Sequence, residues 1–129
     1  MRTALSVLVV EDDEDIRDRL VARLTRLDYR VDAAPTGEAG FEAALADPPD
    51  LVLVDALLAG ADGLAVTRRL RAQPRTARVP VLVVSMADQG PDERFRPRDV
   101  EAMVQALLGP ALTRTAALPT TGRSPASPR

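Results

Sequence analysis

The sequence contains no histidine and no cysteine, and all seventeen of its basic residues are arginine. Without His or Cys the protein cannot use an imidazole base, a thiolate nucleophile, a Cys/His zinc site or a disulfide framework. Aromatic residues make up only 2% of the chain, so the expected core consists of Leu, Val and Ala. The available chemistry is therefore that of carboxylates, hydroxyls, arginine and the backbone.

Long apolar segments are also missing. No apolar run approaches the ~20 residues that cross a membrane, and the stretch from Met1 to Val10 lacks the shape of a secretory signal. We therefore expect a cytoplasmic protein that makes no contact with a membrane.

The net charge of −2 is unevenly distributed along the chain. Residues 1–108 carry 14 Arg and 19 acidic residues, a net charge of −5, whereas residues 109–129 carry three Arg and no acid, a net charge of +3. A domain of net charge −5 repels nucleic-acid phosphates, which supply most non-specific affinity. We therefore expect no direct DNA binding.

Short apolar runs alternate with helical patterns, which is typical of an α/β domain with a parallel sheet. The pattern predicts strands at residues 4–10, 29–34, 51–54 and 80–84. It predicts helices at residues 15–27, from the N-cap Thr36 to about Ala46, at 64–73 and at 98–108. Residues 109–129, rich in Pro, Ser and Thr, are predicted to be a disordered tail after a domain at 1–108.

Acidic side chains follow two of the predicted strands. Glu11, Asp12 and Asp13 follow the first strand, Asp55 follows the third, and the hydroxyl of Ser85 follows the fourth. The carboxyl ends of parallel strands meet at one edge, which is where open α/β sheets bind ligands. Clustered carboxylates require a cation or a proton to offset their repulsion, and all-oxygen ligands favour Mg²⁺ over zinc.

Each acidic residue also has a purely structural explanation. Asp13, Glu14, Asp15 and Asp18 suit the acidic first turn of a helix, and Glu11 and Asp12 could belong to it. Asp55 could cap a loop, and the nearby glycines could be ordinary turn residues. These explanations do not account for acids at successive strand ends.

Four segments together resemble a response-regulator receiver domain. They are VLVVEDDEDIRDRL (7–20), LVLVDALLAGADGL (51–64), VPVLVVS (79–85) and, less closely, FRPRDV (95–100). The resemblance spans the globular part of the chain, residues 4–108. It implies a flavodoxin-like, doubly wound parallel sheet with strand order 2-1-3-4-5.

The resemblance also implies roles for individual residues. Asp55 corresponds to the phosphoryl acceptor, and Glu11 and Asp12 to the acidic pair that holds Mg²⁺. The backbone carbonyl of Leu57 corresponds to a further metal ligand, and Ser85 to a hydrogen-bond donor to the phosphoryl group. The implied partners are a histidine kinase or a histidine phosphotransfer protein and an unknown downstream protein. Catalysis beyond self-catalysed phosphorylation and dephosphorylation is not expected.

The sequence departs from the family after the fourth strand. The phosphate-pairing Lys of the family is replaced by Arg96, and Met86 stands where a small residue is usual. Ten residues separate Ser85 from Arg96, whereas a typical helix alone needs ~10–14. The helix that the family has between its fourth and fifth strands is therefore predicted to be absent or about one turn long, with a short fifth strand around Phe95.

These departures leave alternatives open. A degenerate pseudo-receiver would keep the fold as a phosphate-independent interaction module. A carboxylate phosphatase is disfavoured because Leu57 occupies the place of its second acid, and a flavin protein because EDDED replaces a phosphate-binding loop. We expect a monomer or a weak dimer.

Overall fold

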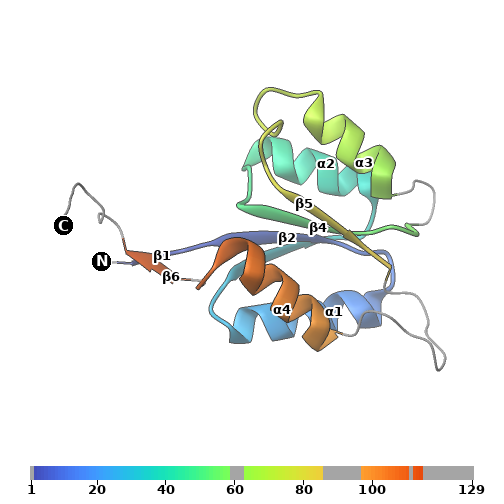
Figure 1. The fold of residues 1–129 in the computed structure, drawn as a ribbon. Coiled ribbons are helices and arrows are strands. Elements are labelled where there is room, and N and C mark those ends of the chain that lie inside the picture. The colour runs from blue at the N-terminus through green and yellow to red at the C-terminus, as the bar shows by residue number, and fades with distance from the viewer. Residues whose placement is uncertain (1, 59–62, 86–96, 111, 115–129) are drawn as a thin grey trace.

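The computed structural model describes residues 2–58, 63–85, 97–110 and 112–114. Its strands and helices alternate along most of this chain (Figure 1). The strands are β1 (Arg2–Ala4), β2 (Ser6–Val10), β3 (Arg30–Ala34), β4 (Leu51–Asp55), β5 (Val81–Val84) and β6 (Leu112–Arg114). The helices are α1 (Glu14–Arg26), α2 (Gly37–Ala46), α3 (Gly63–Arg71) and α4 (Pro97–Leu108).

The central sheet has four parallel strands in the order β3-β2-β4-β5. Counted among these four alone, the order is 2-1-3-4, which confirms the predicted doubly wound topology. Val10 pairs with Val54 in the β2–β4 register, so β2 and β4 end side by side. Residues 86–96 lie outside the described residues. They include Phe95, with the predicted fifth strand, and the shortened helix predicted before that strand, which is not α4.

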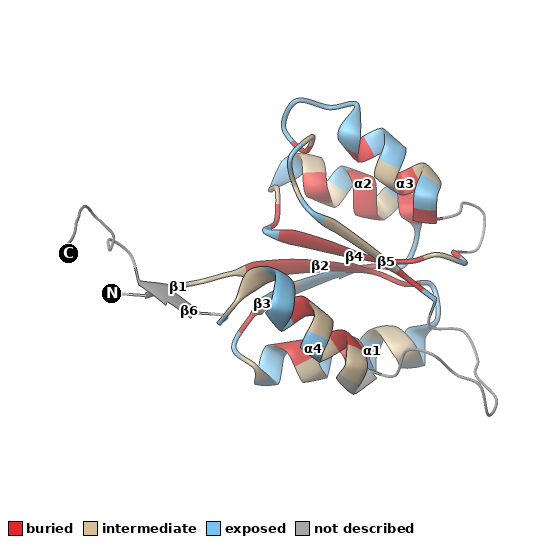
Figure 2. Ribbon diagram, in the orientation of Figure 1, coloured by how far each residue is buried: buried red, intermediate tan, exposed pale blue. Residues whose placement is uncertain are grey.

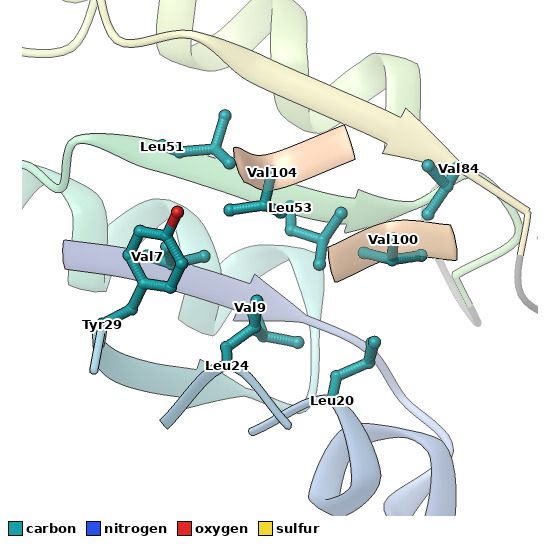
Figure 3. Packing of buried hydrophobic residues seen from close by; sticks show 10 residues of the cluster. All are labelled: Val7, Val9, Leu20, Leu24, Tyr29, Leu51, Leu53, Val84, Val100 and Val104. Atoms are coloured by element: carbon teal, nitrogen blue, oxygen red, sulfur yellow. The ribbon is translucent and has the colours of Figure 1, made fainter. Parts of the chain in front are cut away.

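Helices cover both faces of the sheet, with α1 and α4 on one side and α2 and α3 on the other (Figure 1). Strands β2 and β4 are buried along their whole length (Figure 2). Alternate residues of each strand therefore enter two separate cores. One core contains Val9, Leu24 and Val104, and its buried members come from β2, β4, β5, α1 and α4, with Tyr29 just before β3 (Figure 3). The other contains Leu8, Phe41 and Val66.

Two helices begin at N-cap residues whose side chains accept hydrogen bonds from the first turn. The Asp13 carboxylate accepts the backbone N–H of Ile16 at 3.0 Å, and Thr36 Oγ1 accepts that of Ala39 at 3.0 Å. Each bond satisfies a donor that the first turn of the helix leaves free. Asp13 therefore has the structural role that its sequence position suggested.

A hydrogen bond joins the residue that follows α4 to the residue that precedes β3. The Tyr29 hydroxyl donates a hydrogen bond of 2.7 Å to the Gly109 carbonyl, and Gly109 adopts a φ of 76°, which favours glycine at a helix end. Arg23 of α1 also pairs with Glu101 of α4 at 2.5 Å. These contacts hold the last helix against the first.

Strand β6 differs from the sequence prediction. Residues 112–114 were expected within a disordered tail, yet they pair antiparallel with β1, placing Thr3 opposite Thr113. Predicted strand 4–10 is correspondingly divided, because only β2 joins the parallel sheet. Backbone hydrogen bonds across β1 and β6 require no apolar pattern, so periodicity did not reveal them. The division at residue 108 stays a prediction.

Within the described ranges, no helix combines the length and hydropathy needed to cross a bilayer.

Replacing Leu24 by Ala is expected to lower the free energy of unfolding by about 3 kcal/mol, because the change leaves a cavity in a packed core. Leu24 is fully buried where α1 meets the sheet. Urea denaturation measures the effect. Leu107→Ala is the matched control, since Leu107 on α4 is 56% exposed and should change stability by less than about 0.5 kcal/mol. Equal losses in both variants would contradict this packing.

Candidate functional site

Three carboxylates meet at the carboxyl edge of the sheet. Glu11 and Asp12 follow β2, and Asp55 is the last residue of β4, which is the neighbouring strand. One oxygen from each of the three lies within 4.8 Å of the others. The structure thus brings together the acids that the sequence placed at two strand ends.

Glu11 is the most buried member, with only 1% of its surface exposed. Its Oε2 accepts the backbone N–H of Asp13 at 3.1 Å, whereas its Oε1 is buried without a hydrogen-bond partner. The pKa of Glu11 is raised from 4.5 to about 8, mainly because the side chain is buried; the Asp13 N–H lowers this pKa, and the neighbouring Asp55 and Asp12 raise it. Without a cation, Glu11 is therefore largely protonated at neutral pH.

Asp55 is held in a defined orientation and is 5% exposed. Its Oδ1 accepts the backbone N–H of Leu57 at 2.9 Å. It also pairs in register with Val84, so Ser85 directly follows the strand residue beside Asp55 and is itself exposed. The side chain of Leu57 is 62% exposed. The structure thus gathers Glu11, Asp12 and Asp55, with Ser85 at the end of the adjacent strand.

Two residues near the site were not predicted to contribute to it. The Arg17 guanidinium, on α1, donates a hydrogen bond of 3.1 Å to the backbone carbonyl of Glu11. Gly63 begins α3, and a Cβ there would lie 2.8 Å from the backbone oxygen of Asp55. The glycine itself is visible in the sequence, but a turn explains it equally well there. No sequence pattern singles out Arg17 among the arginines.

A family model described as the response regulator receiver domain matches residues 7–104. This chain belongs to the response regulator receiver domain family. The match runs from β2, through the three carboxylates, into α4. Receiver domains are signalling modules of two-component systems, in which phosphorylation and Mg²⁺ are general properties.

The curated relatives of this receiver domain include transcriptional regulators. AfsQ1 of Streptomyces coelicolor is 40% identical over 80 residues, which is 62% of this chain and 34% of AfsQ1. RpaA of Synechocystis, described as a DNA-binding dual master transcriptional regulator, is 35% identical over 116 residues, 79% of this chain and 48% of RpaA. This chain thus spans about a third to a half of the length of these relatives.

Solved receiver domains have the same fold. The chemotaxis response regulator CheY4 of Vibrio cholerae superposes with a TM-score of 0.72 at 21% identity, covering 82% of this chain and all of that one. The receiver domain of the sensor histidine kinase PA1611 from Pseudomonas aeruginosa superposes with a TM-score of 0.71 at 25% identity, covering 83% and 99% of the two chains. The PA1611 structure has a magnesium ion coordinated in its active-site cleft.

The donor set of this receiver domain suits a hard divalent cation. The three clustered side chains offer carboxylate oxygens, which Mg²⁺ prefers, and His and Cys are absent from the chain. The orphaned Oε1 of Glu11 is a buried oxygen that lacks a donor. A cation beside it would replace the proton as the source of positive charge.

Gly63→Ala is expected to lower the free energy of unfolding by about 1–3 kcal/mol because the added methyl group overpacks the site. The new Cβ would lie 2.8 Å from the Asp55 backbone oxygen and 3.0 Å from the Ala56 Cα, so the backbone that carries Asp55 must shift. Urea denaturation measures the loss. Leu64→Ala is the control, because Leu64 is the next residue and is exposed. An unchanged stability of Gly63→Ala would contradict this close approach.

Proposed function

We propose that this receiver accepts a phosphoryl group on Asp55, with Mg²⁺, and passes the signal on through protein contacts. The observation that carries the proposal is the carboxylate cluster. Asp55 is nearly buried at the end of β4, and its carboxylate lies within 4.8 Å of Glu11 and Asp12 oxygens. A single acid capping a loop would require neither neighbour.

Glu11, Asp12 and Asp55 are the side chains that would hold Mg²⁺, with the backbone carbonyl of Leu57 as a further ligand. A bound Mg²⁺ would neutralise charge on the carboxylates and on the incoming phosphoryl oxygens. The protein contributes a fixed arrangement of oxygens. The Asp13 N–H orients Glu11, and Arg17 holds the Glu11 backbone.

The Leu57 N–H fixes the Asp55 carboxylate through Oδ1, so we assign Oδ2 as the nucleophile. An Oδ2–phosphorus bond forms while the phosphorus–nitrogen bond of a phosphohistidine breaks, and the imidazole nitrogen retains the electron pair. Ser85, beyond Val84, is assigned as a hydrogen-bond donor to a phosphoryl oxygen. Arg96, the assigned phosphate-pairing cation, lies outside the described residues.

The phosphodonor in this proposal is a histidine kinase or a histidine phosphotransfer protein. The family membership supports this class of partner, because receivers in two-component systems accept phosphoryl groups from phosphohistidine. The absence of His from the chain is consistent with this, since the donor imidazole belongs to the other protein.

Incubation with acetyl phosphate and Mg²⁺, followed by intact-mass analysis, tests the proposal. We expect a mass increase of one phosphoryl group that disappears when a chelator replaces Mg²⁺. A cognate histidine kinase, if identified, provides a second donor. No labelling by either donor would overturn the proposal and favour the phosphate-independent pseudo-receiver.

A further inference from the structure

The backbone of Glu11 is held from both sides at the point where β2 ends. Its N–H donates to the Ala34 carbonyl at 3.1 Å, which continues the β2–β3 pairing one residue beyond Val10. Its carbonyl accepts a hydrogen bond of 3.1 Å from the guanidinium of Arg17 on α1. Arg17 therefore ties the first helix to the strand end that carries the most buried acid of the site.

This bond closes a turn that other hydrogen bonds hold only in part. The Asp13 N–H donates to the Glu11 carboxylate at 3.1 Å, and the Asp13 carboxylate accepts the Ile16 N–H at 3.0 Å. The Asp13 carbonyl also accepts the Arg17 backbone N–H at 2.8 Å. These three bonds fix the turn to the start of the helix, but they leave the backbone of Glu11 free to move. The Arg17 guanidinium links that backbone directly to α1.

A rigid frame is more important for Mg²⁺ than for Ca²⁺. Mg²⁺ requires nearly octahedral ligands at about 2.0–2.1 Å, whereas Ca²⁺ accepts about six to eight oxygens at about 2.3–2.6 Å in flexible arrangements. The clustered carboxylates of Glu11, Asp12 and Asp55 offer oxygens that suit either cation. Glu11 Oε1 is buried without a hydrogen-bond partner, so the backbone and the packing around the side chain determine where this oxygen lies.

We propose that Arg17 is a positioning residue of the metal site and gives the site a preference for Mg²⁺ over Ca²⁺. The inference rests on the proposed function, because it takes Glu11 and Asp12 as ligands of the cation. Arg17 bonds the carbonyl of Glu11, so it acts on the carboxylate through the backbone. Without this bond the strand end can move relative to α1, which a Ca²⁺ site tolerates and an octahedral Mg²⁺ site does not.

The sign of the effect separates positioning from charge. A guanidinium near the site repels a cation, so charge alone predicts that removing Arg17 tightens Mg²⁺ binding. Positioning predicts the opposite, because the ligand loses its support. Arg19 is the matched control, since it is an exposed arginine two residues further along α1. Arg19→Ala removes the same charge and leaves the bond from Arg17 to Glu11 intact.

Isothermal titration calorimetry of the full chain with magnesium chloride and with calcium chloride, at one pH and ionic strength, tests the proposal. In Arg17→Ala we expect the Kd of Mg²⁺ to rise about tenfold, as is common when a group that orients a metal ligand is lost. The Kd of Ca²⁺ should rise less than about threefold. Arg19→Ala should leave the Kd of Mg²⁺ within about twofold of its original value, since salt screens an exposed charge. Alanine is a strong helix former, so α1 should be kept in both variants.

A destabilised variant shows whether lower stability alone weakens metal binding. Leu24→Ala loses packing in the core, and Leu24 is not one of the clustered acids. Under conditions in which every variant is folded, Leu24→Ala should therefore bind Mg²⁺ with the Kd of the unaltered chain. Thermal unfolding of each variant without metal identifies these conditions.

An Mg²⁺ Kd in Arg17→Ala that is unchanged or lower would overturn this inference and leave the proposed function in place. Equal weakening of Mg²⁺ and Ca²⁺ binding would also overturn it, because the bond would then support the site without selecting the cation. So would a similar loss of Mg²⁺ affinity in Leu24→Ala or Arg19→Ala. If the unaltered chain binds neither cation, the proposed metal site and this inference both fail.

Discussion

Asp55→Asn is expected to abolish phosphoryl labelling by acetyl phosphate and Mg²⁺. The substitution keeps the shape of the side chain, and its amide oxygen can still accept the Leu57 N–H that now binds Oδ1. It removes the carboxylate nucleophile and one of the three clustered charges. Intact-mass spectrometry measures the labelled fraction, and thermal unfolding shows whether the variant is folded.

The matched control for this experiment is Asp13→Asn. Asp13 is also an acid at the end of β2, but its carboxylate caps α1 through the Ile16 N–H. Asn caps helices about as well as Asp, so labelling should be retained. Labelling that persists in Asp55→Asn would place the acceptor elsewhere. Labelling lost equally in both variants would indicate a general effect of charge instead of a specific nucleophile.

The stability of the metal-free protein is expected to fall as pH rises towards about 8, with Glu11 as a main cause. Its folded-state pKa of about 8 exceeds the ordinary value of 4.5. The folded state therefore binds more protons than the unfolded state between these values, and stability decreases with pH there. The contribution is fully present below pH 4.5 and is lost as pH passes 8. A shift of this size corresponds to at most about 5 kcal/mol.

Urea denaturation across this pH range, in the presence of a chelator, measures the loss. Glu11→Gln should flatten the profile relative to the unaltered chain, because it cannot ionise. Saturating Mg²⁺ should restore stability at high pH, by ~2.7 kcal/mol at a hundredfold excess over its dissociation constant. Below about pH 8, the apparent Mg²⁺ affinity should rise by up to about tenfold per pH unit. A Glu11→Gln profile parallel to that of the unaltered chain would contradict the raised pKa.

The parts of the fold that local patterns determine were predictable. The apolar run that ends at Glu11 reflects burial of β2 on both faces, and the four-residue spacing in α1 reflects burial of one face of the helix. Convergence of Glu11, Asp12 and Asp55 followed from strand order, which the family resemblance supplied. The assignments of Ser85, Arg96 and Leu57 stay predictions.

Other features depend on contacts that no local pattern encodes. The pairing of β1 with β6 joins opposite ends of the described chain, and neither segment has an alternating apolar pattern. The bond from Arg17 to the Glu11 carbonyl depends on how α1 leaves the strand. The raised pKa of Glu11 depends on the burial of its side chain, one oxygen of which has no hydrogen-bond partner. The sequence does not reveal this burial.

The two-sided burial of β2 has a consequence for alignment during folding. Val9 faces one core and Leu8 the other, so sliding the strand by one residue would exchange one apolar surface for another. Hydrophobicity thus aligns β2 only weakly. Polar residues at the two ends of the strand fix its register. At one end the Ser6 backbone N–H donates a 2.7 Å hydrogen bond to the Asp50 carboxylate, and at the other Glu11 lies at the carboxyl edge of the sheet. The acid assigned to metal binding therefore also acts as an alignment mark for the sheet.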